Sequence, residues 1–119
     1  MDMRKKEVLR GKKDFGRLYK RGKSVADRYI VVIFLENKLP YTRTAVLASK
    51  KVGNSVTRNR AKRLIKESLR SINGEIAPGY DLILIARNSI TGRKCAEVED
   101  SLRRGLKKAN LIGTTGLSK

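Results

Sequence analysis

The side chains best suited to chemistry lie together in residues 50–70, which read KKVGNSVTRNRAKRLIKESLR. Arginine offers a planar fork of donors that matches phosphate oxygens and base edges, and asparagine offers both a donor and an acceptor. On a helical wheel at about 100° per residue, the polar side chains of one side are Asn59, Arg60, Lys62, Arg63, Lys66 and Arg70. Like charges fixed on one face repel one another unless a polyanion neutralises them. The pattern therefore predicts binding of a phosphate backbone.

This basic face requires a helix over residues 55–72, and the apolar residues of the same segment indicate one. The opposite side of the wheel carries a stripe wide enough to bury, formed by Ala61, Leu64, Ile65, Ser68, Leu69 and Ile72. The pair Asn73-Gly74 follows, which is typical of a left-handed helix end. A charged helix face taken alone is equally compatible with a solvated surface. The rest of the chain has to decide between the two interpretations.

The overall charge favours a binding surface. The chain has 29 Lys and Arg against 11 Asp and Glu in 119 residues, a formal net charge of +18. Residues 4–28 form a second basic concentration beside residues 50–70, and no acidic block is present to neutralise either one. Composition therefore predicts a nucleic-acid-binding protein.

Several classes of catalytic site lack the residues they need. The chain has no histidine, which removes the commonest general base and zinc ligand. It also lacks a glycine-rich phosphate loop, and its single cysteine, Cys95, excludes an internal disulfide and is expected to be a small residue at the edge of the core. The one tight carboxylate cluster, Glu97, Glu99 and Asp100, is expected to stabilise a helix start rather than to hold a metal. We therefore expect no catalytic residue and no protein-bound metal.

The periodicity predicts helices and strands in the order αβββαβα. The expected helices are 13–21, with Asp14 as a plausible cap and Gly22 as its stop, then 55–72, and then about 95–110. The expected strands are 23–27, 29–36, 41–49 and 80–86, with 41–49 as the antiparallel partner of 29–36. The unbroken apolar run in 80–86 indicates a strand covered on both faces. This order argues for an α+β two-layer sandwich with a mixed four-stranded sheet.

The chain is expected to form one RNA-binding domain over residues 1–110. Residues 111–119 are small and polar and are expected to be a flexible tail. No apolar run is long enough for a membrane span, and the basic N-terminus does not read as a signal peptide. These features predict a cytoplasmic protein.

Residues 50–66, with Arg58-Asn59-Arg60 at their centre, closely resemble the signature of the bacterial ribonuclease P protein subunit. The similarity extends over most of the chain. Residues 13–15, 19–22 and 24–26 look like the first helix and turn of that family, and residues 80–87 look like its last strand.

The resemblance implies a protein that binds a large catalytic RNA and the 5′ leader of precursor transfer RNA, with the cleavage chemistry carried by RNA and its Mg²⁺. It implies contacts to the catalytic RNA from Lys50, Lys51, Asn54, Arg58, Asn59, Arg60, Lys62, Arg63 and Lys66. It also implies a leader-binding cleft between the first helix and the sheet, with Phe15, Arg17, Tyr19 and Lys20. The expected fold is then like ribosomal protein S5 domain 2, with a left-handed βαβ crossover.

Two alternatives stay open at this point. Phe15 and Tyr19 could be plain core residues, because both are apolar and lie four positions apart on a short helix. The chain could also be a ribosomal or other structural RNA-binding protein without a role in processing, since both classes need only phosphate contacts.

Overall fold

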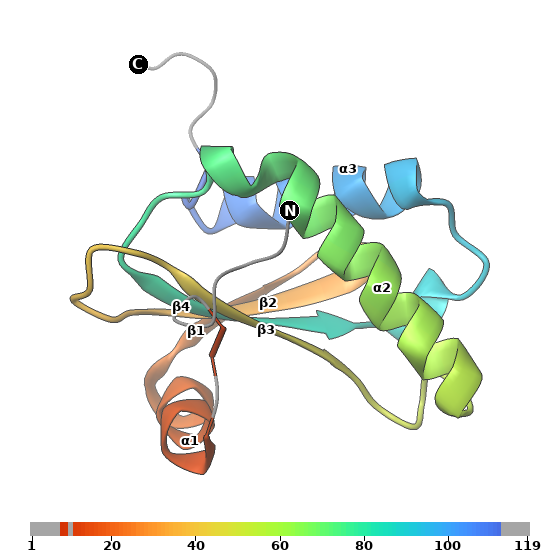
Figure 1. The fold of residues 1–119 in the computed structure, drawn as a ribbon, viewed down its shortest axis with the longest axis horizontal. Coiled ribbons are helices and arrows are strands. Elements are labelled where there is room, and N and C mark those ends of the chain that lie inside the picture. The colour runs from red at the N-terminus through yellow and green to blue at the C-terminus, as the bar shows by residue number, and fades with distance from the viewer. Residues whose placement is uncertain (1–7, 10, 113–119) are drawn as a thin grey trace.

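The computed structural model describes residues 8–9 and 11–112 of the chain. In chain order the elements are α1 (Lys12–Arg21), β1 (Lys23–Ala26), β2 (Ile30–Glu36), β3 (Arg43–Ala48), α2 (Ser55–Ile72), β4 (Tyr80–Ala86) and α3 (Cys95–Lys108). Short 3₁₀ turns, η2 (Asn73–Glu75) and η3 (Asn88–Ile90), flank β4. The predicted α+β class and element order are confirmed (Figure 1).

The four strands form one mixed sheet in the order β1-β2-β4-β3. β4 pairs antiparallel with β2 and parallel with β3. The prediction that β2 and β3 pair directly is wrong, because β4 lies between them. β4 is the most buried of the four strands, and a central place in the sheet with helices over both faces removes its apolar side chains from water. The left-handed sense of the β3–α2–β4 crossover stays a prediction.

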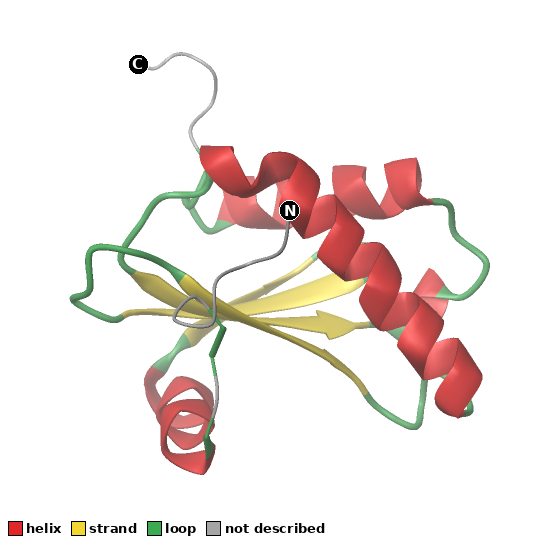
Figure 2. Cartoon of the chain, viewed as in Figure 1, coloured by secondary structure: helices red, strands yellow, loops and turns green. Residues whose placement is uncertain are grey.

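Helices cover both faces of this sheet. α2 and α3 lie on one face and α1 lies on the other (Figures 1 and 2). Along β4, Leu82 and Leu84 join the core under α2 and α3, whereas Ile83 joins the cluster under α1. β4 is thus covered on both sides, as its sequence predicted. The two-layer description becomes a sheet with two helices on one side and one on the other.

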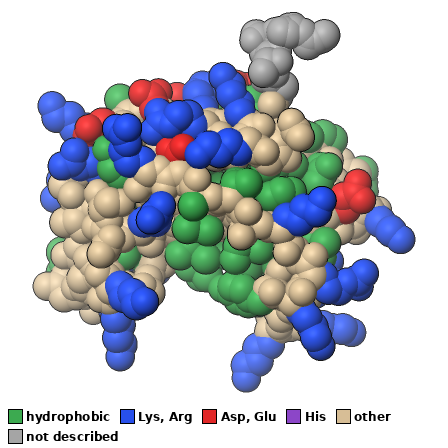
Figure 3. Space-filling view, turned by 180° about the vertical axis from the view of Figure 1, so that it is seen from behind, with side chains coloured by type: hydrophobic (Ala, Val, Ile, Leu, Met, Phe, Trp, Pro, Cys, Tyr) green, Lys and Arg blue, Asp and Glu red, His purple; other side chains and the backbone are tan. Residues whose placement is uncertain are grey.

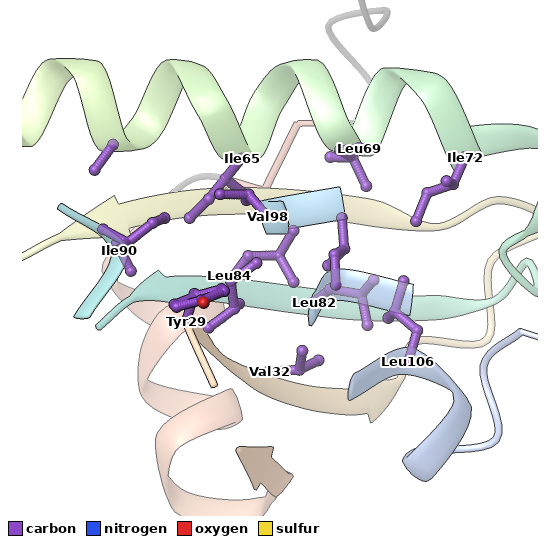
Figure 4. Packing of buried hydrophobic residues seen from close by; sticks show 14 of the residues in the cluster. Tyr29, Val32, Ile65, Leu69, Ile72, Leu82, Leu84, Ile90, Val98 and Leu106 are labelled. Carbon is purple, nitrogen blue, oxygen red and sulfur yellow. The ribbon is translucent and has the colours of Figure 1, made fainter. Parts of the chain in front are cut away.

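The main core lies between the sheet and helices α2 and α3. The predicted apolar stripe of α2 is confirmed: Ala61, Ile65, Ser68, Leu69 and Ile72 are buried, and Leu64 is half-buried against them. Figure 4 shows Ile65, Leu69 and Ile72 pointing from α2 toward β4. Val98, Leu102 and Leu106 close the core from α3. This packing turns the opposite face of α2 outward.

Helix ends differ from prediction. α1 begins at Lys12 after Gly11, which makes no side-chain cap, and Asp14 instead forms an ion pair with Arg17 at 3.3 Å. Asn73 keeps a right-handed conformation (φ −55°), so the chain runs on into η2 and no left-handed terminator forms at Asn73-Gly74.

The expected tail also differs at its start. Leu111 and Ile112 are buried, and the Leu111 carbonyl accepts a hydrogen bond from the Ala77 N–H at 2.8 Å. Both side chains are therefore part of the core, and the domain extends past the predicted boundary at 110. The rest of the predicted tail, 113–119, lies outside the described residues. Among the described helices, none is both long and apolar enough to cross a membrane.

Candidate nucleic-acid interface

A tight turn sets the start of α2. The Val52 and Gly53 N–H groups donate to the Ser49 and Lys50 carbonyls at 3.0 and 3.2 Å. Gly53 has φ +148°, and a Cβ at this position would lie 2.9 Å from the Thr57 side chain, so the turn requires glycine. Asn54 then caps the helix, its Oδ1 accepting from the Thr57 N–H at 3.0 Å. This cap was missed in the sequence, although Asn before Ser-Val-Thr is a recognisable cap signal.

The turn and the outer face of α2 bring all the predicted RNA-contacting residues onto one surface, which we call the α2 surface. Most of their side chains are exposed, namely Lys50, Lys51, Asn54, Asn59, Arg60, Arg63 and Lys66. Arg58 and Lys62 are half-buried, and the Arg58 guanidinium donates to the Ser55 hydroxyl at 3.4 Å. The helix thus holds a dense set of donors in fixed relative positions.

The α2 surface is not neutralised by the protein itself. Within the described residues, none of its Lys or Arg side chains forms an ion pair. The basic residues of α3 differ, because Arg103 pairs with Glu75 and Glu99, and Arg104 and Lys108 pair with Asp27. Unpaired cations on a rigid face are available to a polyanion, whereas paired cations are already satisfied. This contrast favours a binding surface over a merely solvated helix, and contact of these residues with RNA stays a prediction.

A second surface lies on the α1 side of the sheet. The strand register aligns Val31, Ile85 and Leu47 across β2, β4 and β3, and all three are half-buried. We call this row the sheet floor. α1 packs over the neighbouring row through the buried Leu18. Seen from behind, hydrophobic side chains gather in the middle of the molecule with Lys and Arg on the rims below them (Figure 3). The sequence signal for this floor is the continuous apolar run in β2 and β4, which places apolar side chains on both faces of the sheet.

The expected cleft residues of α1 have different environments. Tyr19 is 54% exposed, so the plain-core alternative does not hold for it. Phe15 is half-buried against the cluster beneath α1, and Lys20 is exposed. Arg17 attaches α1 to the sheet, because its guanidinium donates to the buried Asp81 at 2.7 Å. A contact of Arg17 with the leader stays a prediction.

Asp81 at the start of β4 is the centre of a buried ion-pair network, which we call the Asp81 network. Arg43 donates to both carboxylate oxygens at 2.8 and 2.7 Å, and Asn37 donates to Oδ1 at 2.9 Å. Burial alone would raise the pKa of the Asp81 carboxyl, but the hydrogen bonds from Arg43, Asn37 and Arg17 outweigh it and hold that pKa below its ordinary value. The network ties α1 to the sheet near the start of β4, whereas the sheet floor lies near the end of that strand.

A second buried carboxylate, Asp27, joins the β1–β2 turn to α3. It accepts hydrogen bonds from the Ser101 hydroxyl at 2.8 Å, from Arg104 at 3.0 Å and from Lys108 at 3.0 Å. Burial raises the pKa of Asp27, but these bonds and the Arg28 backbone N–H together lower it well below its ordinary value. Asp27 is therefore ionised and paired in the folded protein.

This arrangement predicts a specific loss of stability in acid. A carboxyl whose folded-state pKa is lowered stabilises the fold above its unfolded pKa of about 4, and that contribution disappears as pH falls through the folded pKa. Asp27→Asn is expected to be less stable than wild type at pH 7 and to lose less free energy of unfolding between pH 6 and pH 3. Urea unfolding at several pH values across this range measures the free energy of unfolding of both proteins. An equal loss between pH 6 and pH 3 in Asp27→Asn and wild type would contradict the prediction.

Comparison with known proteins identifies the family of this chain. A family model described as Ribonuclease P matches residues 3–110. The chain belongs to the ribonuclease P protein family. Among its curated relatives are two named ribonuclease P protein component. One from Pelotomaculum thermopropionicum is 44% identical over 88% of this chain and 94% of its own length. One from Clostridioides difficile is 40% identical over 93% and 98%.

Solved structures of ribonuclease P proteins have the same fold. The protein from Staphylococcus aureus matches with a TM-score of 0.81 and 35% identity over 90% of this chain and 98% of its own. The protein from Thermotoga maritima matches with a TM-score of 0.78 and 32% identity over 86% and 96%. These similarities favour the ribonuclease P interpretation over the ribosomal alternative left open by charge.

Two residues of the predicted carboxylate cluster, Glu97 and Glu99, have structural partners. Glu97 accepts from the Lys94 N–H at 2.8 Å at the start of α3, and Glu99 pairs with Arg103 at 3.3 Å, so both stabilise the helix as expected. Over the part of the chain that the structure describes, no group of three or more His, Cys, Asp or Glu residues is placed to hold a metal. Cys95 is half-buried, with its sulfur 3.7 Å from the Ser68 hydroxyl, as expected for the edge of the core.

Proposed function

We propose that this chain is the protein subunit of a ribonuclease P holoenzyme, in which it binds a catalytic RNA and the 5′ leader of precursor transfer RNA. The observation that carries the proposal is the unpaired positive charge of the α2 surface in a chain of the ribonuclease P family. In this proposal the RNA cleaves the leader. The holoenzyme acts in the cytoplasm, where precursor transfer RNA is found.

The α2 surface supports the catalytic-RNA half of the proposal. Its arginines present fixed multi-donor groups that suit phosphate oxygens, and Lys50 and Lys51 extend the same charge into the turn before the helix. Because none of these cations forms an ion pair within the described residues, they remain available to phosphate groups. Binding should therefore be strong and strongly dependent on salt.

The sheet floor and α1 support the leader half. Single-stranded RNA is commonly held on apolar or aromatic platforms with basic rims, because every base has an apolar face and every nucleotide a phosphate. Val31, Ile85 and Leu47 supply an apolar floor, and Tyr19 supplies an exposed aromatic ring next to Lys20. The proposal places unstacked leader nucleotides on this platform.

Magnesium belongs with the RNA in this proposal. When bound there, Mg²⁺ would activate the attacking water and stabilise the leaving oxygen. The protein's buried carboxylates, Asp27 and Asp81, are each held by basic side chains and are not free to act as ligands. The residues of this chain bind and orient the substrate.

Tyr19→Ala tests the leader site, because its ring is exposed and its loss leaves the core intact. We expect the reconstituted enzyme to lose about 1 to 3 kcal/mol of affinity for precursor transfer RNA, the contribution of one stacked base. Its affinity for mature transfer RNA should not change, because the mature molecule has no leader. Binding to precursors with leaders of increasing length measures this effect.

Tyr19→Phe is the matched control, since it keeps the ring and should keep the affinity. Phe15→Ala should show the same dependence on the leader, provided that thermal melting shows a folded protein, because Phe15 is half-buried. Equal weakening for precursor and mature transfer RNA would remove these aromatic residues from the leader site.

A further inference from the structure

A pocket opens beside the first turns of α2, apart from the sheet floor. It has a volume of about 240 Å³ and lies between one side of the helix and the turn that follows η3. η3 contributes Ile90, and the turn after it contributes the next two residues. The residues contributed by the helix are Val56, Thr57, Arg60, Ala61 and Leu64. Figure 4 shows Ile90 beneath the N-terminal half of α2. The walls are thus mainly aliphatic, and one guanidinium lines the pocket beside them.

Val56 is the unusual residue of this pocket. Its side chain is 76% exposed, although it is a large aliphatic group on a strongly basic surface. Together with Tyr19, it is one of the two large hydrophobic side chains that stand exposed among the described residues. Arg60 and Arg63 follow Val56 on nearly the same side of the wheel, and neither has an acidic partner in the described part of the chain. The site therefore suits a ligand with an apolar body and anionic flanks.

We propose that one unstacked base of the catalytic RNA inserts into this pocket. A nucleobase presents flat apolar faces to the aliphatic walls while its flanking phosphates remain outside, within reach of the arginines. The volume is below the roughly 300–1,000 Å³ of most small-molecule sites, which suits a single base better than a whole nucleotide cofactor. The inference rests on the proposed function and adds a position-specific contact to an otherwise electrostatic surface.

The pocket is formed before any ligand binds. The Arg93 N–H donates to the Ile90 carbonyl at 3.0 Å, and the Thr91 hydroxyl lies 3.4 Å from the Val52 carbonyl, which ties the turn to the start of α2. Gly92 takes φ +82° in this turn, and its N–H has no acceptor among the described residues. That N–H is available to an edge of the inserted base.

Val56→Ala tests the proposal without threatening the fold, because the side chain is exposed. We expect roughly tenfold weaker binding to the catalytic RNA in the absence of substrate, since two methyl groups that the base would cover are lost. The dependence of affinity on salt should stay as in wild type, because no phosphate contact is removed. Ser71→Ala, an exposed change near the other end of α2, is the control and should bind as wild type does.

Chemical probing of the RNA bases gives the second readout. One base protected by the wild-type protein should become reactive with Val56→Ala, while protection of the backbone along the α2 surface persists. Unchanged affinity and probing would overturn the proposal, as would a defect that appears only with precursor transfer RNA, because the occupant would then be substrate. If the wild-type protein fails to bind the catalytic RNA at all, the proposed function itself fails, which is a different result.

Discussion

Replacement of Arg60 and Arg63 together by alanine is expected to weaken binding of the catalytic RNA by roughly 100-fold or more. Each removed guanidinium loses a charge-assisted hydrogen bond worth about 1.5 to 3 kcal/mol. Neither arginine has an acidic partner among the described residues, so the loss falls on the RNA contact and not on the fold. The slope of log affinity against log salt should flatten by roughly 1 to 2 units, because each phosphate contact contributes about 0.7 to 0.9.

Filter binding or fluorescence titration of the catalytic RNA over a range of salt concentrations measures both effects. The matched control is Arg103→Ala with Lys107→Ala on α3, which removes the same charge from a helix where Arg103 is already paired with Glu75 and Glu99. It should leave the slope nearly unchanged. If both double variants weaken binding equally, net charge alone drives the interaction and the α2 surface has no special role.

Asp81→Ala is expected to destabilise the free protein by about 3 to 5 kcal/mol, the usual effect of removing one partner of a buried ion pair. The Asp81 side chain is fully buried, and its loss leaves Arg17 and Arg43 without their main acceptor. Because Arg17 ties α1 to the sheet, a variant that still folds should also bind the leader less well.

Urea unfolding gives the stability of this variant, and leader-dependent binding of precursor transfer RNA gives its functional effect. Glu67→Ala is the control, since Glu67 is exposed on α2 and has no ion pair within the described residues. It should change stability little. A free energy of unfolding for Asp81→Ala within about 0.5 kcal/mol of wild type, the range typical of surface changes, would show that the Asp81 network does not anchor α1.

The elements were predictable where local pattern and burial coincide. The stripe from Ala61 to Ile72 repeats with the period of a helix and is buried as that period requires. The apolar run of β4 is covered on both faces. The neighbours of each strand were not predictable, because the short connection of residues 37–42 suits a hairpin equally well. Only the tertiary structure shows that this connection crosses over the position of β4, so that β4 lies between β2 and β3 in the sheet.

The candidate site also has one part that local sequence predicts and another part that depends on contacts between distant segments. The exposed basic face of α2 follows from residue type and spacing on one helix, whereas Lys50, Lys51, Asn54 and Arg58 were added by the resemblance to the family. The ion pair of Arg17 with Asp81 could not be predicted, because Asp81 lies far along the chain and cannot be inferred from the local sequence. The pocket at Val56 needs the turn after η3, which reaches α2 only through folding. Contacts between distant segments therefore account for both features that the sequence did not show, the ion pair of Arg17 and the pocket at Val56.

We propose that this chain assists a catalytic RNA and does not cut RNA itself. The most direct measurement is cleavage of precursor transfer RNA by a bacterial ribonuclease P RNA with and without this chain, at a magnesium concentration where the RNA alone is slow. The chain together with the RNA should release the 5′ leader rapidly at the mature end, and the chain alone should release none. Cleavage by the chain alone, or no increase in the cleavage rate when the chain is added to the RNA, would contradict this proposal.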